Sequence, residues 1–166
     1  MRTFSTLVFA LILLVSPIRV MSDATQSRCS FFPPSIGYIN DFENVLLPKE
    51  KQVLTKMIQK HRNKVGNEIA IVTIPSIEPY SDLFHYSLDL ANCWGVGNKQ
   101  ANNGVLIIFS SKLRQVHIQN GKGIVSQLTN AETKSIIDST MIPLFKSKGY
   151  YEGFREGLKE IMAEID

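Results

Sequence analysis

The fold is decided by residues 68–74, which read EIAIVTI. This run is apolar and β-branched at nearly every position, which is typical of a strand buried on both faces. A helical pattern over residues 48–65 precedes it. A second helix, capped by Asp82 and reaching Trp94, leads to another apolar strand, Val105–Ser110. This order predicts two parallel strands joined by a helical crossover.

The second half of the chain predicts a hairpin followed by two helices. A shorter strand, Arg114–Gln119, follows the previous strand closely enough to pair with it in the antiparallel sense. A capping box at Thr129–Glu132 opens a helix that we expect to run to Ile142, where Pro143 should end it. A last helix covers about residues 150–165. Together these elements predict an α/β fold, with helices covering both faces of a small mixed sheet.

The first 22 residues have the pattern of a secretory signal peptide. Arg2 precedes an apolar stretch that Pro17 interrupts, and the stretch is shorter than the roughly 20 residues that span a bilayer. The alternative is a retained anchor extending through Val20, which Pro17 and Arg19 disfavour. The predicted divisions are a signal peptide at 1–22, an extended N-terminal arm at 23–37 and one domain at 38–166. We expect a soluble extracytoplasmic protein whose mature chain does not span a membrane.

Composition narrows the function classes further. The 166 residues include 18 Lys or Arg and 15 Asp or Glu, and the leader contains two of the basic residues. Nucleic-acid binding is not expected, because it usually requires a concentrated basic face. Apolar residues make up 44% of the chain, which suits one globular domain and is too high for a disordered chain.

The chain contains two cysteines, Cys29 and Cys93. In an oxidising compartment they could form a disulfide that closes a loop of about 65 residues. The alternative is two unpaired thiols, and the sequence leaves this choice open. Acylation of Cys29 is not expected, because residues 26–28 separate it from the region where a leader would be cleaved.

Most catalytic motifs are absent from the sequence. It has no P-loop, no G-x-S-x-G, no H-E-x-x-H and no C-x-x-C pattern. The three histidines, His61, His85 and His117, lie on different predicted elements without the spacing of metal ligands. Any site must therefore be built from residues that the fold brings together.

Two polar turns are the candidates for such a site. In the turn Asn120-Gly121-Lys122-Gly123, backbone N–H groups could face an anion, with charge added by Lys122. In the turn Asn102-Asn103-Gly104, amide oxygens could join Asp41 as ligands of a hard cation such as Ca²⁺. The alternative for both segments is an ordinary tight or left-handed turn without a ligand.

Seven segments of the sequence form a wider pattern. They are Ile39–Phe42 with Val45–Leu47, Glu68–Pro75, Trp94–Gly97, Asn102–Ile107, Asn120–Ile124, Met141–Pro143 and Tyr150–Gly153. Taken in order, they resemble the TPM domain family of extracytoplasmic proteins, over about residues 38–165. The resemblance implies a three-layer αβα sandwich. It also implies a domain for which acid-phosphatase activity and Ca²⁺ binding have been proposed, and which in other members assists membrane complexes.

The sequence departs from the family pattern where acidic residues usually stand. Neutral residues occupy three such positions, Asn102, Val125 and Asn130, and Asp41 is the clearest remaining carboxylate. Since Ca²⁺ affinity depends on ligand charge, the resemblance implies a weakened cation site formed by Asp41, Asn102, Asn103 and Asn130.

Two functions follow from these observations. The first is a binding or accessory protein for an envelope or membrane-associated partner, with Ca²⁺ as a candidate ligand. The alternative is a weak metal-dependent acid phosphatase acting on phosphomonoesters, in which Lys122 and the Gly121–Gly123 amides receive phosphate. In both cases we expect Asp41, Asn103 and Gly121 to meet on one side of the sheet.

Overall fold

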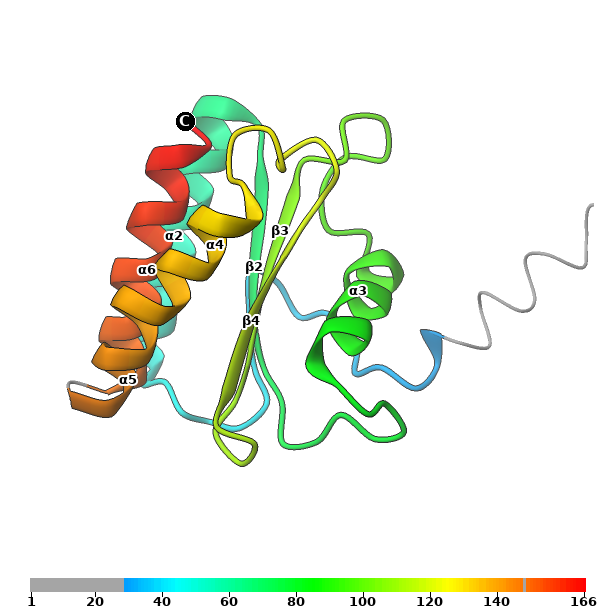
Figure 1. Ribbon diagram of the computed structural model, residues 1–166, viewed down its shortest axis with the longest axis vertical. Coiled ribbons are helices and arrows are strands. Elements are labelled where there is room, and N and C mark those ends of the chain that lie inside the picture. The colour runs from blue at the N-terminus through cyan, green and yellow to red at the C-terminus, as the bar shows by residue number, and fades with distance from the viewer. Residues whose placement is uncertain (1–28, 148) are drawn as a thin grey trace, which may run out of the picture. The chain divides into compact units, whose positions relative to one another are not determined.

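The computed structural model describes residues 29–147 and 149–166, and Figure 1 shows the arrangement of their helices and strands. In chain order these are β1 (Ile39–Asp41), α2 (Pro48–Val65), β2 (Glu68–Thr73), α3 (Leu83–Trp94), β3 (Gly104–Ser110), β4 (Gln115–Asn120), α4 (Asn130–Ile136), a π-helical turn (Ile137–Met141), α5 (Ile142–Ser147) and α6 (Tyr150–Glu164). The predicted signal peptide and the first part of the predicted arm, residues 23–28, lie outside the described residues. Residues Phe32–Asp166 pack together as one unit.

The described strands form a sheet with helices on both faces, as predicted. Ile69 and Ile71 of β2 belong to a core cluster that includes residues of α2, α4 and α6. Their neighbours Ala70 and Val72 belong to a second cluster with residues of α3. Figure 1 shows α3 on one side of the sheet and the other labelled helices on the opposite side. The architecture is a three-layer αβα sandwich, because strands that are apolar on both sides must be covered twice.

The sheet has the strand order β1-β2-β3-β4. The first three strands run parallel, and β4 pairs antiparallel with β3. The parallel crossover and the hairpin were predicted, whereas β1 was not. β1 has only three residues, and the prolines and glycine before it indicate an extended arm rather than a strand.

The two parallel crossovers have opposite hands. β1, β2 and β3 are parallel neighbours in that order, so both crossovers advance in the same direction across the sheet. The first passes through α2 on one face and the second through α3 on the other. Since nearly all such crossovers are right-handed, one of these two departs from the rule.

Local signals set the ends of the helices around β2. α2 begins at Pro48, and the Glu50 side chain accepts a hydrogen bond from the Leu47 N–H at 2.7 Å. α2 ends before Gly66, whose φ of 84° lies in the left-handed region that favours glycine. Asp82 caps α3 by accepting a hydrogen bond from the backbone N–H of the third residue in that helix.

The prediction that Pro143 ends the third helix is wrong. α4 passes through the π-helical turn into α5, and Pro143 is the second residue of α5. The Ile142 N–H donates to the Ile137 carbonyl, a bond that spans five residues instead of four. This wider turn shifts the hydrogen-bond pattern just before the proline. Pro143 therefore stands in a first helical turn, where a missing N–H costs little.

The end of the predicted arm contributes to the core. Phe32 is buried, and its ring packs edge-on against Tyr86 at 5.1 Å between centroids. The Trp94 indole N–H donates to the Pro33 carbonyl at 2.8 Å. These contacts place the chain before β1 against α3, on the face that α3 covers.

Cys29 and Cys93 are both disulfide-bonded, and since the chain has no other cysteine they pair with each other. Of the two alternatives for the cysteines, the structure therefore shows the disulfide. A disulfide is consistent with an oxidising, extracytoplasmic compartment. Within residues 29–147 and 149–166, no helix combines the length and apolarity needed to cross a membrane.

Candidate functional site

A cleft of about 720 Å³ opens between α3 and the sheet, at the end where β3 begins and β4 finishes. Its volume lies within the roughly 300–1,000 Å³ typical of small-ligand sites. Leu88 and Leu106 provide apolar walls. Its polar lining side chains come from α3, from the loop before β3, and from β4 and the turn after it: Asn92, Asn98, Lys99, Asn102, Gln119, Asn120 and Lys122.

The cleft is framed by two loops that pack backbone against backbone. A Cβ atom at Gly104 would lie 2.1 Å from the Val96 carbonyl oxygen, and one at Gly121 would lie 2.2 Å from the Asn102 carbonyl oxygen. The Gly121 N–H donates to the Gly104 carbonyl at 2.8 Å, and the Gly123 N–H donates to the Asn102 carbonyl at 3.0 Å. The approach is too close for any side chain at Gly104 or Gly121, and it joins the two predicted polar turns.

These hydrogen bonds correct the predicted anion site at Asn120–Gly123. The N–H groups of Gly121 and Gly123, which we expected to face an anion, donate to backbone carbonyls instead. Lys122 does line the cleft, and Lys99 joins it from the opposite loop. Lys99 was not among the residues predicted from the sequence. Its position as the charged residue in the turn-rich stretch GVGNKQANNG (residues 95–104) is a signal that could have identified it.

The asparagine side chains of the loop before β3 are used mainly to hold its shape. The Asn98 Oδ1 accepts hydrogen bonds from the N–H groups of Gln100 and Ala101, at 2.8 and 3.2 Å. The Asn103 Oδ1 accepts one from the Asn98 N–H at 2.9 Å, and its Nδ2 donates to the Gly66 carbonyl at 2.9 Å. These amide oxygens therefore act as turn-forming acceptors, as the alternative interpretation of this segment anticipated.

Asp41 does not lie at the cleft. Asp41 pairs with Thr73 of β2, and Thr73 pairs with Phe109 of β3. Asp41 therefore lies level with Phe109, whereas the cleft lies beside Gly104 at the other end of β3. Five residues of β3 separate these levels, roughly 17 Å along the strand. The expectation that Asp41, Asn103 and Gly121 meet on one side is therefore wrong. β4 runs antiparallel, so the turn after it returns to the amino end of β1–β3, while Asp41 stands at their carboxyl end.

The Asp41 carboxylate is buried and fully hydrogen-bonded. One oxygen accepts from the Val45 N–H at 3.0 Å and the Thr73 hydroxyl at 2.7 Å. The other accepts from the Leu46 N–H at 3.1 Å and lies 2.8 Å from the Lys51 ammonium. Burial alone raises the pKa of this carboxyl, but these four donors outweigh it and hold the pKa below its ordinary value. Asp41 thus stays charged and closes the loop between β1 and α2.

Of the predicted site residues, the cleft brings together Asn102, Asn120, Gly121 and Lys122, but its lining does not include Asp41, Asn103, Gly123 or Asn130. Asn130 is exposed at the first position of α4.

Asn120 connects the cleft to the first turns of α4. Its Nδ2 donates to the Thr133 hydroxyl at 2.8 Å and to the Leu128 carbonyl at 3.2 Å. Its Oδ1 is buried and has no hydrogen-bond partner in the described part of the chain.

The donor set of the cleft does not fit the Ca²⁺ ion that the resemblance implies. Ca²⁺ takes six to eight oxygen ligands, commonly including carboxylates. The charged side chains among the described lining residues are Lys99 and Lys122. Neither forms an ion pair with a described residue. Across residues 29–147 and 149–166, no group of three or more His, Cys, Asp or Glu side chains could hold a metal ion. The charge of the cleft favours anions instead.

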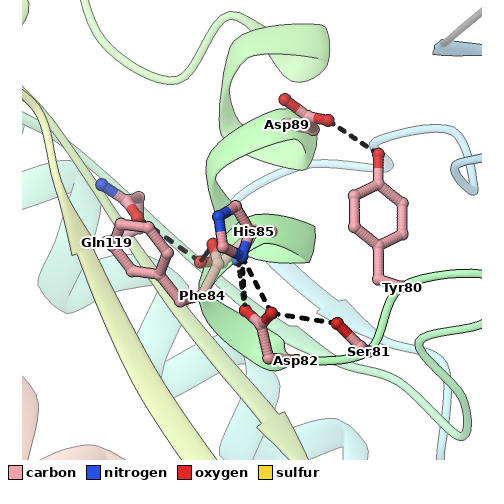
Figure 2. Close-up of polar contacts among 8 residues, drawn as sticks. Tyr80, Ser81, Asp82, Phe84, His85, Asp89 and Gln119 are labelled. Atoms are coloured by element: carbon pink, nitrogen blue, oxygen red, sulfur yellow. Dashed lines mark hydrogen bonds and ion pairs between the residues drawn. The ribbon is translucent and has the colours of Figure 1, made fainter.

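A cluster of polar contacts lies at the start of α3 (Figure 2). The His85 N–H donates to the Asp82 Oδ1 at 2.9 Å, and its ring Nδ1 lies 2.8 Å from the Asp82 Oδ2. The Tyr80 hydroxyl donates to the Asp89 Oδ2 at 2.8 Å. The sequence predicted the capping role of Asp82 but not its pairing with His85. Both side chains are well exposed to solvent, so we assign this cluster a structural role.

His117, beside this cluster on β4, should make the fold sensitive to acid. Its ring packs against Phe84, and its Nε2 is buried without a hydrogen-bond partner in the described residues. Burial, opposed by Gln119 and Asp82, holds the pKa of His117 below its ordinary value of 6.5. Because the pKa of His117 is lower in the folded state than in the unfolded state, His117 contributes fully to stability above its unfolded-state pKa. This contribution is lost as the pH falls toward the folded-state pKa.

We therefore expect His117→Phe to reduce the loss of stability between about pH 7.5 and pH 5.5. Urea denaturation at several pH values measures this loss for the parent and the variant. A variant whose unfolding free energy follows the same pH dependence as the parent would show that His117 is not responsible.

Comparison with known proteins gives consistent results. The family description "TPM domain" matches residues 39–164. The N-terminal domain of a protein from P. gingivalis, solved by NMR, is 32% identical, with 78% of this chain and 82% of that chain covered and a TM-score of 0.71. Two further NMR structures share the fold at lower identity. BA42 from Bizionia argentinensis is 18% identical, with 75% of this chain and 83% of that chain covered and a TM-score of 0.65. The N-terminal domain of cg2496 from Corynebacterium glutamicum is 12% identical, with 81% of this chain and 84% of that chain covered and a TM-score of 0.62. No curated protein matched the chain.

Proposed function

This chain belongs to the TPM domain family, and from that premise we propose that it is an extracytoplasmic binding protein whose cleft holds an oxyanion of its ligand. The observation that carries the proposal is the charge of the cleft. Its described charged lining side chains are two lysines that no described carboxylate neutralises. An anion entering the cleft would gain the attraction of both.

Lys99 and Lys122 approach the cleft from different loops, so an anion between them would join the loop before β3 to the turn after β4. Lysine ammonium groups bind phosphate and carboxylate as point charges on flexible stems. The amide groups of Asn92 and Asn102 add neutral hydrogen-bonding capacity. The carboxyl end of α3 points to the same place and carries partial negative charge, so the attraction must come from the lysines.

The source of the oxyanion follows from the accessory role. An acidic segment of an envelope or membrane-associated protein presents carboxylates to such a cleft, and a phosphomonoester presents the same chemistry as a small molecule. We propose the acidic segment as the ligand, and the experiment below includes both sources. The apolar walls at Leu88 and Leu106 suit the aliphatic part of a glutamate side chain.

We expect Lys99→Gln and Lys122→Gln each to weaken anion binding about tenfold, or about 1.4 kcal/mol. Titrations of ¹⁵N-labelled protein with inorganic phosphate and with a hexaglutamate peptide measure the binding, followed at the amides of residues 97–104 and 119–123. Lys60→Gln is the matched control, because Lys60 is exposed on α2 and does not line the cleft. Tighter binding of the peptide supports the acidic segment. If both probes bind the two variants as well as the parent, the cleft is not the anion site.

Hydrolysis of phosphomonoesters is the alternative, and it uses the same cleft. It requires a nucleophile or a metal-bound water in addition to phosphate-binding groups. The described lining contains Asn, Gln, Lys, Gly and aliphatic residues, without a Ser, Thr, Cys, His or carboxylate side chain. This composition supports binding over hydrolysis. Turnover of p-nitrophenyl phosphate with Ca²⁺ or Mg²⁺ that disappears in Lys122→Gln would reverse that preference.

A further inference from the structure

A second, smaller pocket lies at the other end of the sheet, where β3 finishes and β4 begins. It has a volume of about 240 Å³ and is formed by β3, β4, α5 and the start of α6. Phe109, Phe145 and Tyr150 line it, with Val116 and Ile142 completing its apolar walls. Five residues of β3 separate it from the cleft, so the two sites are independent.

The apolar walls of this pocket are preformed. The ring centroids of Phe109 and Phe145 are 5.0 Å apart, and those of Phe109 and Tyr150 are 4.9 Å apart. Phe109 is only 4% exposed, so the sheet holds this part of the wall in place. A volume of 240 Å³ falls below the range of about 300–1,000 Å³ for small-molecule sites. It suits one large side chain, which is how a protein partner anchors itself in an interface.

The rim of the pocket is positively charged. Arg114 and Lys146 line it, both are exposed, and neither forms an ion pair within the described residues. Lys112 is exposed nearby on the same hairpin. Glu43 also lies near the rim, and its carboxylate accepts hydrogen bonds from the Ser111 N–H and hydroxyl. Among the described residues that line the pocket, the charged side chains are therefore both cationic.

We infer that this pocket binds an extended segment of a protein partner in which an aromatic or large aliphatic residue precedes acidic residues. The apolar side chain fills the space beside Phe109 and Tyr150, and the following carboxylates face Arg114 and Lys146. Apolar burial supplies the affinity, and the charges select acidic over basic sequences. This inference does not depend on the cleft, which lies at the opposite end of the sheet.

Three short peptides separate the two contributions. The peptide Ac-Phe-Glu-Glu-NH₂ should give saturable shifts at the amides of Val116, Phe145 and Tyr150 in ¹⁵N-labelled full-length protein. Ac-Phe-Lys-Lys-NH₂ and Ac-Gly-Glu-Glu-NH₂ should each bind at least about tenfold more weakly, because each lacks one half of the recognised pattern. Equal binding of the lysine peptide, or no saturable shift with the first peptide, would overturn the inference.

A charge-reversal variant tests the rim. Arg114→Glu combined with Lys146→Glu should weaken binding of Ac-Phe-Glu-Glu-NH₂ at least about tenfold. The matched control is Lys49→Glu combined with Lys56→Glu, two exposed lysines of α2 that do not line the pocket, and it should bind like the parent. If both double variants weakened peptide binding equally, binding would depend only on the net charge of the protein, and the inference would be overturned. Shifts confined to the amides of Lys99 and Lys122 would do the same and would assign the peptide to the cleft.

Discussion

Asp41→Ala should lower the free energy of unfolding by about 3–5 kcal/mol, measured by urea denaturation at pH 7. The buried carboxylate accepts from two backbone N–H groups and the Thr73 hydroxyl, and it pairs with Lys51. Removal of the carboxylate leaves the N–H and hydroxyl donors without their acceptor. The loop between β1 and α2 loses the group that closes it.

The same carboxylate should contribute to acid unfolding. The pKa of Asp41 is lower in the folded state than in the unfolded state. Its contribution to stability is therefore present above the unfolded-state pKa of about 4 and is lost as the pH falls through the folded-state pKa. The Asp41→Ala variant should therefore lose less stability than the parent below about pH 4.

Asp138→Ala is the matched control, because Asp138 is exposed and pairs with Lys134 on the surface. It should cost no more than about 1 kcal/mol. If Asp41→Ala were equally mild, the described contacts of Asp41 would not stabilise the fold.

Because Asp41→Ala should destabilise the fold, this variant is a poor probe of phosphatase activity. A loss of turnover in that variant would report partial unfolding, since Asp41 lies roughly 17 Å along β3 from the cleft. Lys99→Gln and Lys122→Gln are the better probes of chemistry at the cleft, because both side chains are exposed and neither pairs with a described residue.

Gly104→Ala should cost about 3 kcal/mol of stability and abolish anion binding at the cleft. The added Cβ would lie 2.1 Å from the Val96 carbonyl oxygen and 2.9 Å from the Gly97 nitrogen. Both contacts are to backbone atoms, so the loop before β3 must move away from the strand. That movement would displace Lys99 and separate the two loops that frame the cleft.

Urea denaturation and the phosphate titration measure these two effects separately. Gly66→Ala is the control for backbone strain alone, since a Cβ there meets no atom within 4 Å but φ is +84°. It should cost about 1–2 kcal/mol and leave anion binding unchanged. A Gly104→Ala variant that binds phosphate like the parent would show that the close packing of the loops does not shape the cleft.

Much of the fold could be predicted from local patterns. Apolar β-branched runs at Glu68–Ile74 and Val105–Ser110 identify strands buried on both faces, and such strands require helices on both sides. The capping residues and glycines gave the helix starts and ends to within one or two positions around β2. Pro143 misled the prediction, because the same residue is tolerated in a first turn and disruptive in a helix interior.

The candidate site depended on information that residue types do not carry. Gly121 and Asn103 were correctly placed outside the strands, yet the pairing of their polar groups with backbone partners far along the chain could not be deduced from their identity. Asp41 matches a ligand by type, but its oxygens are used by Lys51, Thr73 and two amides. A carboxylate is available to a metal only where the surrounding structure leaves it without donors.

The sequence by itself determined most of the secondary structure, the two-sided burial of the sheet and the family, because periodicity and turn chemistry depend on residues that are neighbours in the chain. The tertiary structure alone decided which loops share an end of the sheet. Strand direction sets that arrangement: the antiparallel β4 carries Lys122 to Lys99, and the parallel β1 carries Asp41 to the opposite end. The directions of β2, β3 and β4 follow from the order of the elements, but β1 pairs with a strand about 30 residues further along the chain, and no local pattern predicted that pairing.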